Sequence, residues 1–434
     1  MKQHDADITI FGAGPAGIAA AVTAARMGGR VLLVERKDKI GGVMTSCPGM
    51  MLGGGYPCGK SIGGFFEEFV SRMIKAEPPI AERRRCSLEN FGDEVVYSHE
   101  PAIALLYEML AESGVTVYVE RTVDTVHMMD KRIQAVDIIS TQGREKLSSS
   151  LFIDCTGNGD IAVNAGVPYQ LGNQDQKMMG VTLTFMMEGV DWAQAFSENG
   201  DPYFTSQAAM GISQGRLHPT IPQIYMLKGF HEGSVFFNTV TVTGVDGTDP
   251  DSVLKGTNEA RARVLSLATF CRNSLPGFEH ARLSQVASSV GVRETRKLEG
   301  MYQLSYADIA EAVKFEDGIV ACDNPLDEVF RDSSETHYSH EAALVKGRYY
   351  TIPFRSLVPK AVTNLLFAGR NLSVDEKAFA SVRGMPQCML MGQAAGIGAG
   401  LAWKNHESVQ DLDTNIVVDL LVQQNVHGIG GRPL

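Results

Sequence analysis

The chain has 434 residues, of which 44% are hydrophobic and 21% are charged, and its formal net charge is -11. We expect two structural units, because domains usually hold about 100–200 residues. The acidic balance disfavours non-specific binding to nucleic acid, which needs a basic surface. The N-terminus lacks the pattern of a secretion signal, and the apolar stretches are too short to span a membrane, which takes about 20 residues. The seven scattered cysteines favour free thiols in a reducing, cytoplasmic compartment.

The first 165 residues alternate between strand and helix patterns. Ser98, followed by Glu100 and Pro101, marks the start of a helix that runs to Glu112. A glycine-rich loop covers 41–64. The other expected helices are 15–27 and 65–73, and the expected strands are 7–11, 30–34, 115–119, 122–128, 133–140 and 151–153.

The middle of the chain has a different pattern, with strands expected at 181–187 and 235–242 and a helix at 252–270. A buried strand at 364–368 and a terminal helix at 386–404 then return to the character of the first part. We therefore predict an α/β protein. Its Rossmann-like domain, a parallel sheet with helices and a small antiparallel sheet, comprises 1–165 and 351–434. An α+β substrate domain, 166–350, is inserted between them.

The sharpest local signal is the segment from Gly12 to Gly17, GAGPAG, which follows a strand and opens a helix. Gly12 permits the tight turn, Gly14 lets the backbone approach a pyrophosphate, and Gly17 lets the helix pack closely. The helix N-terminus attracts phosphate, and Glu35, at the end of the next strand, can accept hydrogen bonds from a ribose. The alternative is a glycine turn without a ligand, but the strand-turn-helix context and Glu35 favour a dinucleotide site.

This motif does not separate FAD from NAD, because both present an ADP half to the turn. Gly41-Gly42 with Thr45 and Ser46 could contact the far half of a long cofactor, or could form a surface loop. Thr156-Gly157 and Gly369-Arg370 each follow a strand. Together with the turn at Gly12, these make three glycine turns at strand ends, which favour one extended FAD.

The last expected helix supports the same interpretation. Pro386 suits its first position, and the helix dipole places partial positive charge there. Backbone N–H groups of Gln387, Cys388 and Met389 could stabilise the negative charge that develops on a reduced flavin. The alternative, that this helix only packs in a core, is compatible with that role.

Several segments together resemble a known family. They are ITIFGAGPAGIAAA, VLLVER, IGG, FIDCTGNGDIA, VGVRETRKLEGMYQLSYADI, IPFRSLVPKAVTNLLFAGRNLS and ASVRGMPQCMLMGQAAGIGAGLA. The chain resembles the FAD-dependent oxidoreductases with a glutathione-reductase-type FAD domain, distantly related to the fumarate reductase and succinate dehydrogenase flavoproteins. The resemblance hardly covers residues 166–287.

The resemblance implies that Val123 presents its backbone to the adenine, and that the Thr156-Gly157 and Gly369-Arg370 turns touch the cofactor. Residues 374–378 lack the histidine found after this last turn in relatives, so no histidine role is transferred to them. The expected cofactor-binding residues are Gly12, Gly14, Pro15, Ala16, Gly17, Glu35, Arg36, Gly42, Val43, Thr45, Val123, Thr156, Gly157, Gly369, Arg370, Gln387, Cys388 and Met389.

Candidate catalytic residues are Arg293, Arg296 and His337. Arginine suits a carboxylate or another oxyanion, although these arginines could instead brace the two domains through Glu294. On a strand Arg293 would face away from Arg296, so at most one of them should reach the flavin. His337 could transfer a proton or lie in a solvated loop.

Metal and thiol chemistry are not expected. The histidines and cysteines have no metal-ligand spacing, so we predict no metal. Cys47 and Cys58 are too far apart in sequence for a short-spaced redox pair.

The favoured hypothesis is a FAD-dependent oxidoreductase that transfers a hydride between flavin and a small organic substrate, which could be anionic, at the domain junction. One alternative is an NAD-dependent oxidoreductase. The other is a non-catalytic electron-transfer flavoprotein subunit. Only one dinucleotide fingerprint is present, so the electron donor or acceptor is unidentified, and homo-oligomer formation is left open.

Overall fold

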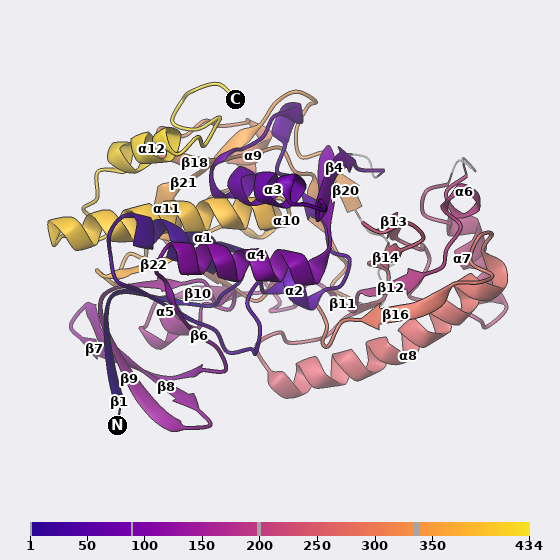
Figure 1. The fold of residues 1–434 in the computed structure, drawn as a ribbon, viewed down its shortest axis with the longest axis horizontal. Coiled ribbons are helices and arrows are strands. Elements are labelled where there is room, and N and C mark those ends of the chain that lie inside the picture. Colours follow the sequence, from indigo (N-terminus) through magenta and orange to yellow (C-terminus); the bar gives the residue numbers. More distant parts are fainter. Residues whose placement is uncertain (1, 88–89, 198–200, 333–338) are drawn as a thin grey trace.

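The computed structural model describes residues 2–87, 90–197, 201–332 and 339–434. Within these residues a seven-stranded sheet forms the centre of the larger part of the molecule, in the order β6-β2-β1-β9-β8-β7, with β22 also beside β9 (Figure 1). Its strands are β1 (Lys2–Phe11), β2 (Val31–Val34), β6 (Thr116–Tyr118), β7 (Thr122–Met129), β8 (Arg132–Ser140), β9 (Gly143–Asp154) and β22 (Leu365–Phe367).

The long strand β9 joins the two ends of the chain. It runs parallel to β1, with Asp154 opposite Phe11. On its other side its first half is antiparallel to β8, and its last residues are parallel to β22, where Phe367 is opposite Asp154. The carboxyl ends of β1, β9 and β22 therefore meet at one edge of the sheet, which is where ligands bind in open α/β folds.

Two helices from opposite ends of the chain cover one face of this sheet (Figure 1). They are α1 (Pro15–Arg26) and α11 (Met385–Asn405), both rich in small residues. A side chain on Gly392 would overlap the carbonyl oxygen of Ala16, so glycine lets the two backbones approach closely. Ile10 and Leu33 belong to the core under these helices, whereas Phe11 and Leu32 face the opposite layer, as alternation along a strand requires.

The remaining elements of this larger part lie around the sheet and its two helices. They are α2 (Val43–Ser46), β3 (Leu52–Gly53), η1 (Pro57–Gly59), α3 (Gly64–Lys75), β4 (Ala81–Arg85), β5 (Asp93–Tyr97), α4 (His99–Glu112), α5 (Asp160–Asn164), β10 (Tyr169–Leu171), β17 (Arg296–Leu298), α9 (Tyr306–Ala310), β18 (Gly318–Cys322), β19 (Leu326–Glu328), β20 (Ser339–Glu341), β21 (Tyr350–Pro353), η2 (Phe354–Leu357), α10 (Glu376–Val382) and α12 (Thr414–Gln423).

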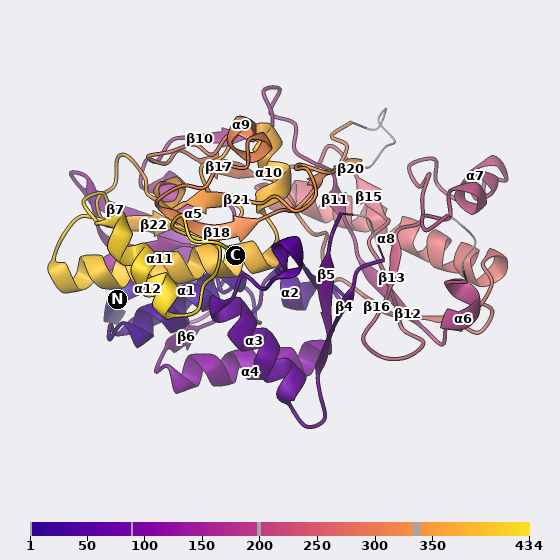
Figure 2. The same ribbon diagram turned by 90° about the horizontal axis from the view of Figure 1, so that it is seen from above.

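A second hydrophobic core, which we call the second core, is formed by buried residues between Val181 and Val290. The long helix α8 covers an antiparallel sheet of order β13-β14-β12-β16, and this unit lies beside the larger one in both views (Figures 1 and 2). Its elements are β11 (Val181–Thr182), β12 (Phe185–Glu188), α6 (Trp192–Ala195), α7 (Thr205–Ser213), β13 (Met226–Lys228), β14 (Val235–Phe237), β15 (Thr241–Val242), α8 (Pro250–Ser274) and β16 (Arg282–Val286).

The predicted α/β fold with a Rossmann-like sheet is confirmed. The expected strands 181–187 and 235–242 are each divided in two, because β11 and β15 pair with each other whereas β12 and β14 join the four-stranded sheet. Helix α12 follows α11, so the helix expected as terminal is not the last. The proposed domain boundaries stay a prediction. Across the described residues, no helix combines the length and apolar character needed to cross a membrane.

Candidate active site

The turn between β1 and α1 forms one wall of a large cavity. Gly12 has a φ of 91°, and a side chain there would collide with the Cys155 carbonyl. A side chain on Gly17 would overlap the Gly12 carbonyl oxygen, so this glycine packs the helix and does not line the cavity. A Cβ on Gly14 would meet only Gly42 Cα, at 4.0 Å, and Gly14, Pro15 and Ala16 line the open space.

Glu35 follows β2, and its carboxylate forms a hydrogen bond with the turn between β1 and α1. Its Oε2 accepts the Ala13 N–H at 2.7 Å, and its Oε1 accepts the Lys37 N–H at 2.9 Å. Each carboxylate oxygen can accept a second hydrogen bond, so a ribose can still be bound. Arg36 and Val123 line the same cavity as Glu35, and their contact with the cofactor stays a prediction.

The glycine-rich loop after β2 contributes Gly42, Val43 and Ser46 to the cavity wall. The expected role of Thr45 is wrong. Its hydroxyl donates a hydrogen bond to the Ile40 carbonyl at 2.7 Å, and the residue does not line the cavity. Thr45 therefore fixes the loop.

Asp154, at the end of β9, organises the Thr156-Gly157 turn. Its carboxylate accepts the Thr156 hydroxyl at 2.7 Å and the Ile161 and Ala162 N–H groups at 2.9 Å. Complete burial raises the pKa of Asp154 to about 6, although these donors oppose the shift. Thr156 and Gly157 line the cavity, and their contact with the cofactor stays a prediction.

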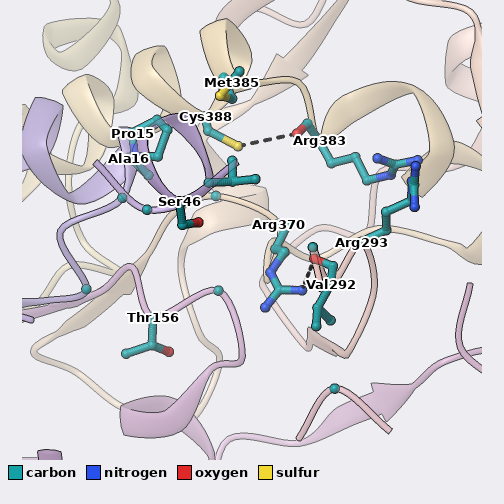
Figure 3. A pocket seen from close by; sticks show the side chains of 18 of the residues that line it. Pro15, Ala16, Ser46, Thr156, Val292, Arg293, Arg370, Arg383, Met385 and Cys388 are labelled. Carbon is teal, nitrogen blue, oxygen red and sulfur yellow. Dashed lines mark hydrogen bonds between the residues drawn. The ribbon is translucent and has the colours of Figure 1, made fainter. Parts of the chain in front are cut away.

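Arg370, in the turn after β22, is a half-buried cation on the cavity wall. It donates to the Val292 carbonyl at 2.7 Å and to Asn158 Oδ1 at 2.6 Å (Figure 3). Burial and the nearby Arg36 lower its pKa to about 10, so it stays charged at neutral pH. Gly369 lines the cavity next to it.

The start of α11 differs in detail from the prediction. The helix begins at Met385, so Cys388 is its fourth residue and donates its N–H to the Gly384 carbonyl at 2.9 Å. The N–H of Met389 is likewise directed along the helix. Of the three N–H groups proposed for the flavin, only that of Gln387 stays in the unpaired first turn. The Cys388 side chain lines the cavity, and burial raises its pKa to about 12.

The side chains of Gln387 and Met389 do not line the cavity. Gln387 Nε2 donates to the Gly54 carbonyl at 2.6 Å, and Met389 is fully buried in the core under α11. These two side chains therefore have packing roles.

Arg293 and Arg296 both line the cavity, and it stays a prediction that at most one of them reaches the flavin. The prediction assumed a strand, but β17 begins only at Arg296, so the alternation does not extend to Arg293. Arg293 donates to Thr182 Oγ1 at 2.6 Å and to the Gly180 carbonyl at 3.1 Å, and Arg296 pairs with Asp160 at 3.2 Å.

Glu294, between these arginines, points into the protein. It is fully buried, accepts the Met179 N–H at 3.0 Å, and pairs with Lys297 at 2.7 Å and with Arg331. Glu294 thus pairs with Lys297 and Arg331, and not with the two arginines through which the alternative would brace the domains.

One continuous cavity of about 820 Å³ joins all these walls. Among the described residues that line it, seven are basic and three are acidic, in a chain whose net charge is negative. The part of the cavity away from the Gly12 turn, which we call the far end, is lined by residues that the sequence did not single out as site residues. These are Met50, Met51, Phe91, Thr182, Thr184, Tyr225 and Asn238. Most of them lie in or beside the second core, in the stretch that the family resemblance hardly covers.

Other candidates do not join this site. His337 lies outside the described residues. Cys47 is buried on the cavity wall, whereas Cys58 is exposed, and both are free thiols. In the described part of the chain, no group of three or more His, Cys, Asp or Glu side chains could hold a metal ion.

Comparison with known proteins identifies the family. The sequence matches the model of the family described as FAD dependent oxidoreductase over residues 7–421. The chain belongs to this family. No curated protein matches it.

Solved structures share the fold at low sequence identity. A geranylgeranyl bacteriochlorophyll reductase-like protein from Thermoplasma acidophilum has 13% identity and a TM-score of 0.51, covering 98% of this chain and 84% of its own. The flavin-dependent brominase Bmp2 has 10% identity and a TM-score of 0.51, with 97% and 84% covered. The myxobacterial chondrochloren halogenase CndH has 11% identity and a TM-score of 0.50, with 96% and 78% covered.

FAD is the cofactor of this family, and the cavity suits it. Gly14 leaves open space beside the unpaired N–H groups at the start of α1, where a pyrophosphate can be bound. Glu35, Val123 and Cys388 line the same cavity.

Proposed function

We propose that this FAD-dependent oxidoreductase transfers a hydride between the flavin and a small anionic organic substrate held where the two hydrophobic cores meet. The observation that carries the proposal is the single cavity. It runs from Gly14 and Glu35 to Arg293, and its far end is lined by Thr182, Thr184 and Asn238, which lie in or beside the second core. Junctions between structural units are common ligand sites, and the volume lies within the range of such pockets.

The residues of the chain divide the work along this cavity. The N-terminus of α1 would hold the pyrophosphate, Glu35 the ribose, and Arg370 would offset the phosphate charge from the opposite wall. Bound FAD supplies the capacity to accept or donate a hydride. Arg293 would orient the substrate, since its guanidinium is held in place by the Thr182 hydroxyl and the Gly180 carbonyl.

Arg383 supports an anionic substrate on the same wall. It pairs with Asp327 at 2.8 Å, and its Nη2 lies 3.9 Å from Met179 Sδ, one residue from the carbonyl that Arg293 contacts. Figure 3 shows both arginine side chains directed to the same side of the cavity. Two guanidinium groups in one region favour the binding of an anion.

The test is an absorbance spectrum of the purified protein, followed by anaerobic addition of small organic acids, then by their reduced or oxidised counterparts. We expect a yellow protein whose flavin is bleached, or reoxidised, by one compound class. Reduction by dithionite is the control for a redox-competent flavin. A flavin that dithionite reduces but no small substrate affects would contradict the proposal and favour an electron-transfer subunit.

Three finer expectations stay predictions. They are the closer relation to the glutathione reductase, fumarate reductase and succinate dehydrogenase flavoproteins, a cytoplasmic location, and assembly into homo-oligomers. The electron donor or acceptor is unidentified.

A further inference from the structure

The far end of the cavity has a polar wall whose groups are held in fixed positions. Arg293 donates to Thr182 Oγ1 and also to Asn238 Oδ1, at 3.3 Å. Thr182 Oγ1 is 3.1 Å from Thr241 Oγ1, so the hydroxyl that supports Arg293 is itself supported. A guanidinium with its orientation fixed in this way is prepared to bind a planar, two-oxygen anion.

Thr184 adds a hydroxyl to this wall that has no partner of ordinary geometry. Its residue is 2% exposed, it lines the cavity, and its Oγ1 has no nitrogen or oxygen partner among the described residues, which leaves the Cys47 thiol as its hydrogen-bond partner. It lies next to the Cys47 thiol, which is a weak donor and acceptor. Buried hydroxyl groups are normally hydrogen-bonded to a nitrogen or oxygen atom, so a hydroxyl that lines a cavity and has only a thiol beside it can bind a ligand atom or a water molecule.

An apolar wall adjoins the polar one. Met50, Met51 and Phe91 pack around Tyr225 in a small cluster with Phe236. The two walls are linked through the backbone: Asn238 donates its N–H to the Tyr225 carbonyl at 3.0 Å, and Met50 donates its N–H to the Cys47 carbonyl at 3.2 Å. Methionine and aromatic side chains together suit a flat, apolar group, since sulfur and ring faces are polarisable.

We propose that the far end of the cavity binds a carboxylate with a ring-sized apolar body, the carboxylate on Arg293 and Thr184 and the ring against Met51, Phe91 and Tyr225. This inference rests on the proposed function, because it names the substrate class for the same site. In the described ranges, seven basic and three acidic side chains line the cavity, which is an excess of four positive charges. A pyrophosphate carries two negative charges and does not balance this excess. The remaining positive charge favours an anionic substrate over a neutral one.

The first experiment compares three probes on the FAD-loaded protein, with binding followed by the change in flavin absorbance and by calorimetry. The probes are benzoate, its neutral analogue benzamide, and acetate, which has the carboxylate without the ring. We expect benzoate to bind at least about tenfold more tightly than either of the others, since each lacks one half of the recognition. Equal affinity for benzamide and benzoate would overturn the proposal.

Matched variants then assign the contacts. Arg293→Met should weaken benzoate about 10- to 100-fold, the usual range for a hydrogen bond to a charged group, and leave benzamide nearly unchanged. Arg282→Met is the control, because Arg282 is 79% exposed on β16 of the same unit. An Arg293→Met variant that binds benzoate as the parent does would contradict the assignment.

Thr184 supplies a test that does not depend on removing a charge. Thr184→Val keeps the shape of the side chain and removes its hydroxyl, so benzoate affinity should fall about five- to tenfold, whereas Thr184→Ser should stay within about twofold of the parent. Equal loss in both variants would point to packing and overturn the role of the hydroxyl.

The two proposals fail in different ways. If the flavin is reducible by dithionite and benzoate binds as expected, but no organic acid exchanges electrons with the flavin, hydride transfer is wrong and the carboxylate site stands. If a neutral substrate reduces the flavin while benzoate does not bind, the carboxylate site is wrong and the oxidoreductase activity stands.

Discussion

The two ends of the cavity are built in different ways. At the end that holds Gly12, Gly14 and Glu35, backbone atoms of strand-end turns form the wall, and the strands that position them belong to one sheet. At the far end, side chains form the wall, and they come from segments as distant as Met50, Thr184 and Arg293. A backbone-built site tolerates little change in shape, whereas a side-chain-built site can change its ligand without changing the fold.

This difference explains how one fold can carry several flavin reactions. The low-identity structures include a reductase-like protein and two halogenating enzymes, and they share the overall fold. Binding of a dinucleotide at the cofactor end uses glycine turns and a helix N-terminus. Under the proposed function, we expect substitutions among the residues of the far end to alter the substrate selectively.

The largest effect is expected at Gly17. In Gly17→Ala the new methyl group would overlap the carbonyl oxygen of Gly12, and neither backbone can move without separating α1 from β1. We expect a loss of at least about 3 kcal/mol in the free energy of unfolding, in the range of severe overpacking. Urea unfolding followed by circular dichroism measures it. A variant as stable as the parent would show that the turn is not packed as described.

Gly14→Ala is the matched comparison, because the two glycines lie in one motif and only one of them is packed. Gly14 has a φ of -76°, which alanine adopts readily, and its methyl group would project towards open space. We expect a stable fold and FAD binding weakened about 100-fold, or about 3 kcal/mol, because the methyl group blocks the pyrophosphate. Calorimetric titration of the FAD-free protein with FAD measures the loss. Unchanged FAD affinity would mean that the pyrophosphate lies elsewhere.

The cofactor end was largely predictable from local sequence. Glycines at strand ends together with an acidic residue after the second strand are typical of a dinucleotide site. Most of the residues named for FAD line the cavity. The errors arose where the prediction depended on the direction of a particular atom. Thr45 bonds its own loop, and the N–H of Cys388 is used within the helix because α11 begins one residue earlier than expected.

The far end could not be predicted in this way. Thr184 and Tyr225 have no distinctive neighbours in sequence, since threonine and aromatic residues are common in any strand. Only the packing of the second core against residues 47–51 brings them to the cavity. The assumption of a strand through Arg293 failed for the same reason, because tertiary contacts, and not alternation, set the direction of that segment. The short apolar runs that form β18 and β21 are not among the predicted strands, although their hydrophobic sequence indicates burial.

The smallest effect is expected at His99, which forms a hydrogen bond with the segment that carries Met50 and Met51. Its Nδ1 accepts the Gly49 N–H at 3.4 Å, and burial lowers its pKa to about 4. The unfolded chain, with an ordinary histidine pKa of about 6.5, therefore takes up the proton first as the pH falls. The stabilising contribution of neutral His99 is complete above pH 6.5 and is lost between pH 6.5 and 4. At pH 5 this loss reaches about 2 kcal/mol, and less if solvent reaches the ring.

Urea unfolding at pH 7.5 and at pH 5.0, with the FAD concentration fixed, tests this expectation. His99→Gln removes the titrating group, so its stability should fall less on acidification than that of the parent. His280→Gln is the control, because His280 is exposed on the surface of the second unit. If both variants lose the same stability as the parent between the two pH values, His99 does not carry the acid sensitivity. If His99→Gln alone is less sensitive, the segment 47–51, and with it the apolar wall of the far end, depends on a neutral histidine.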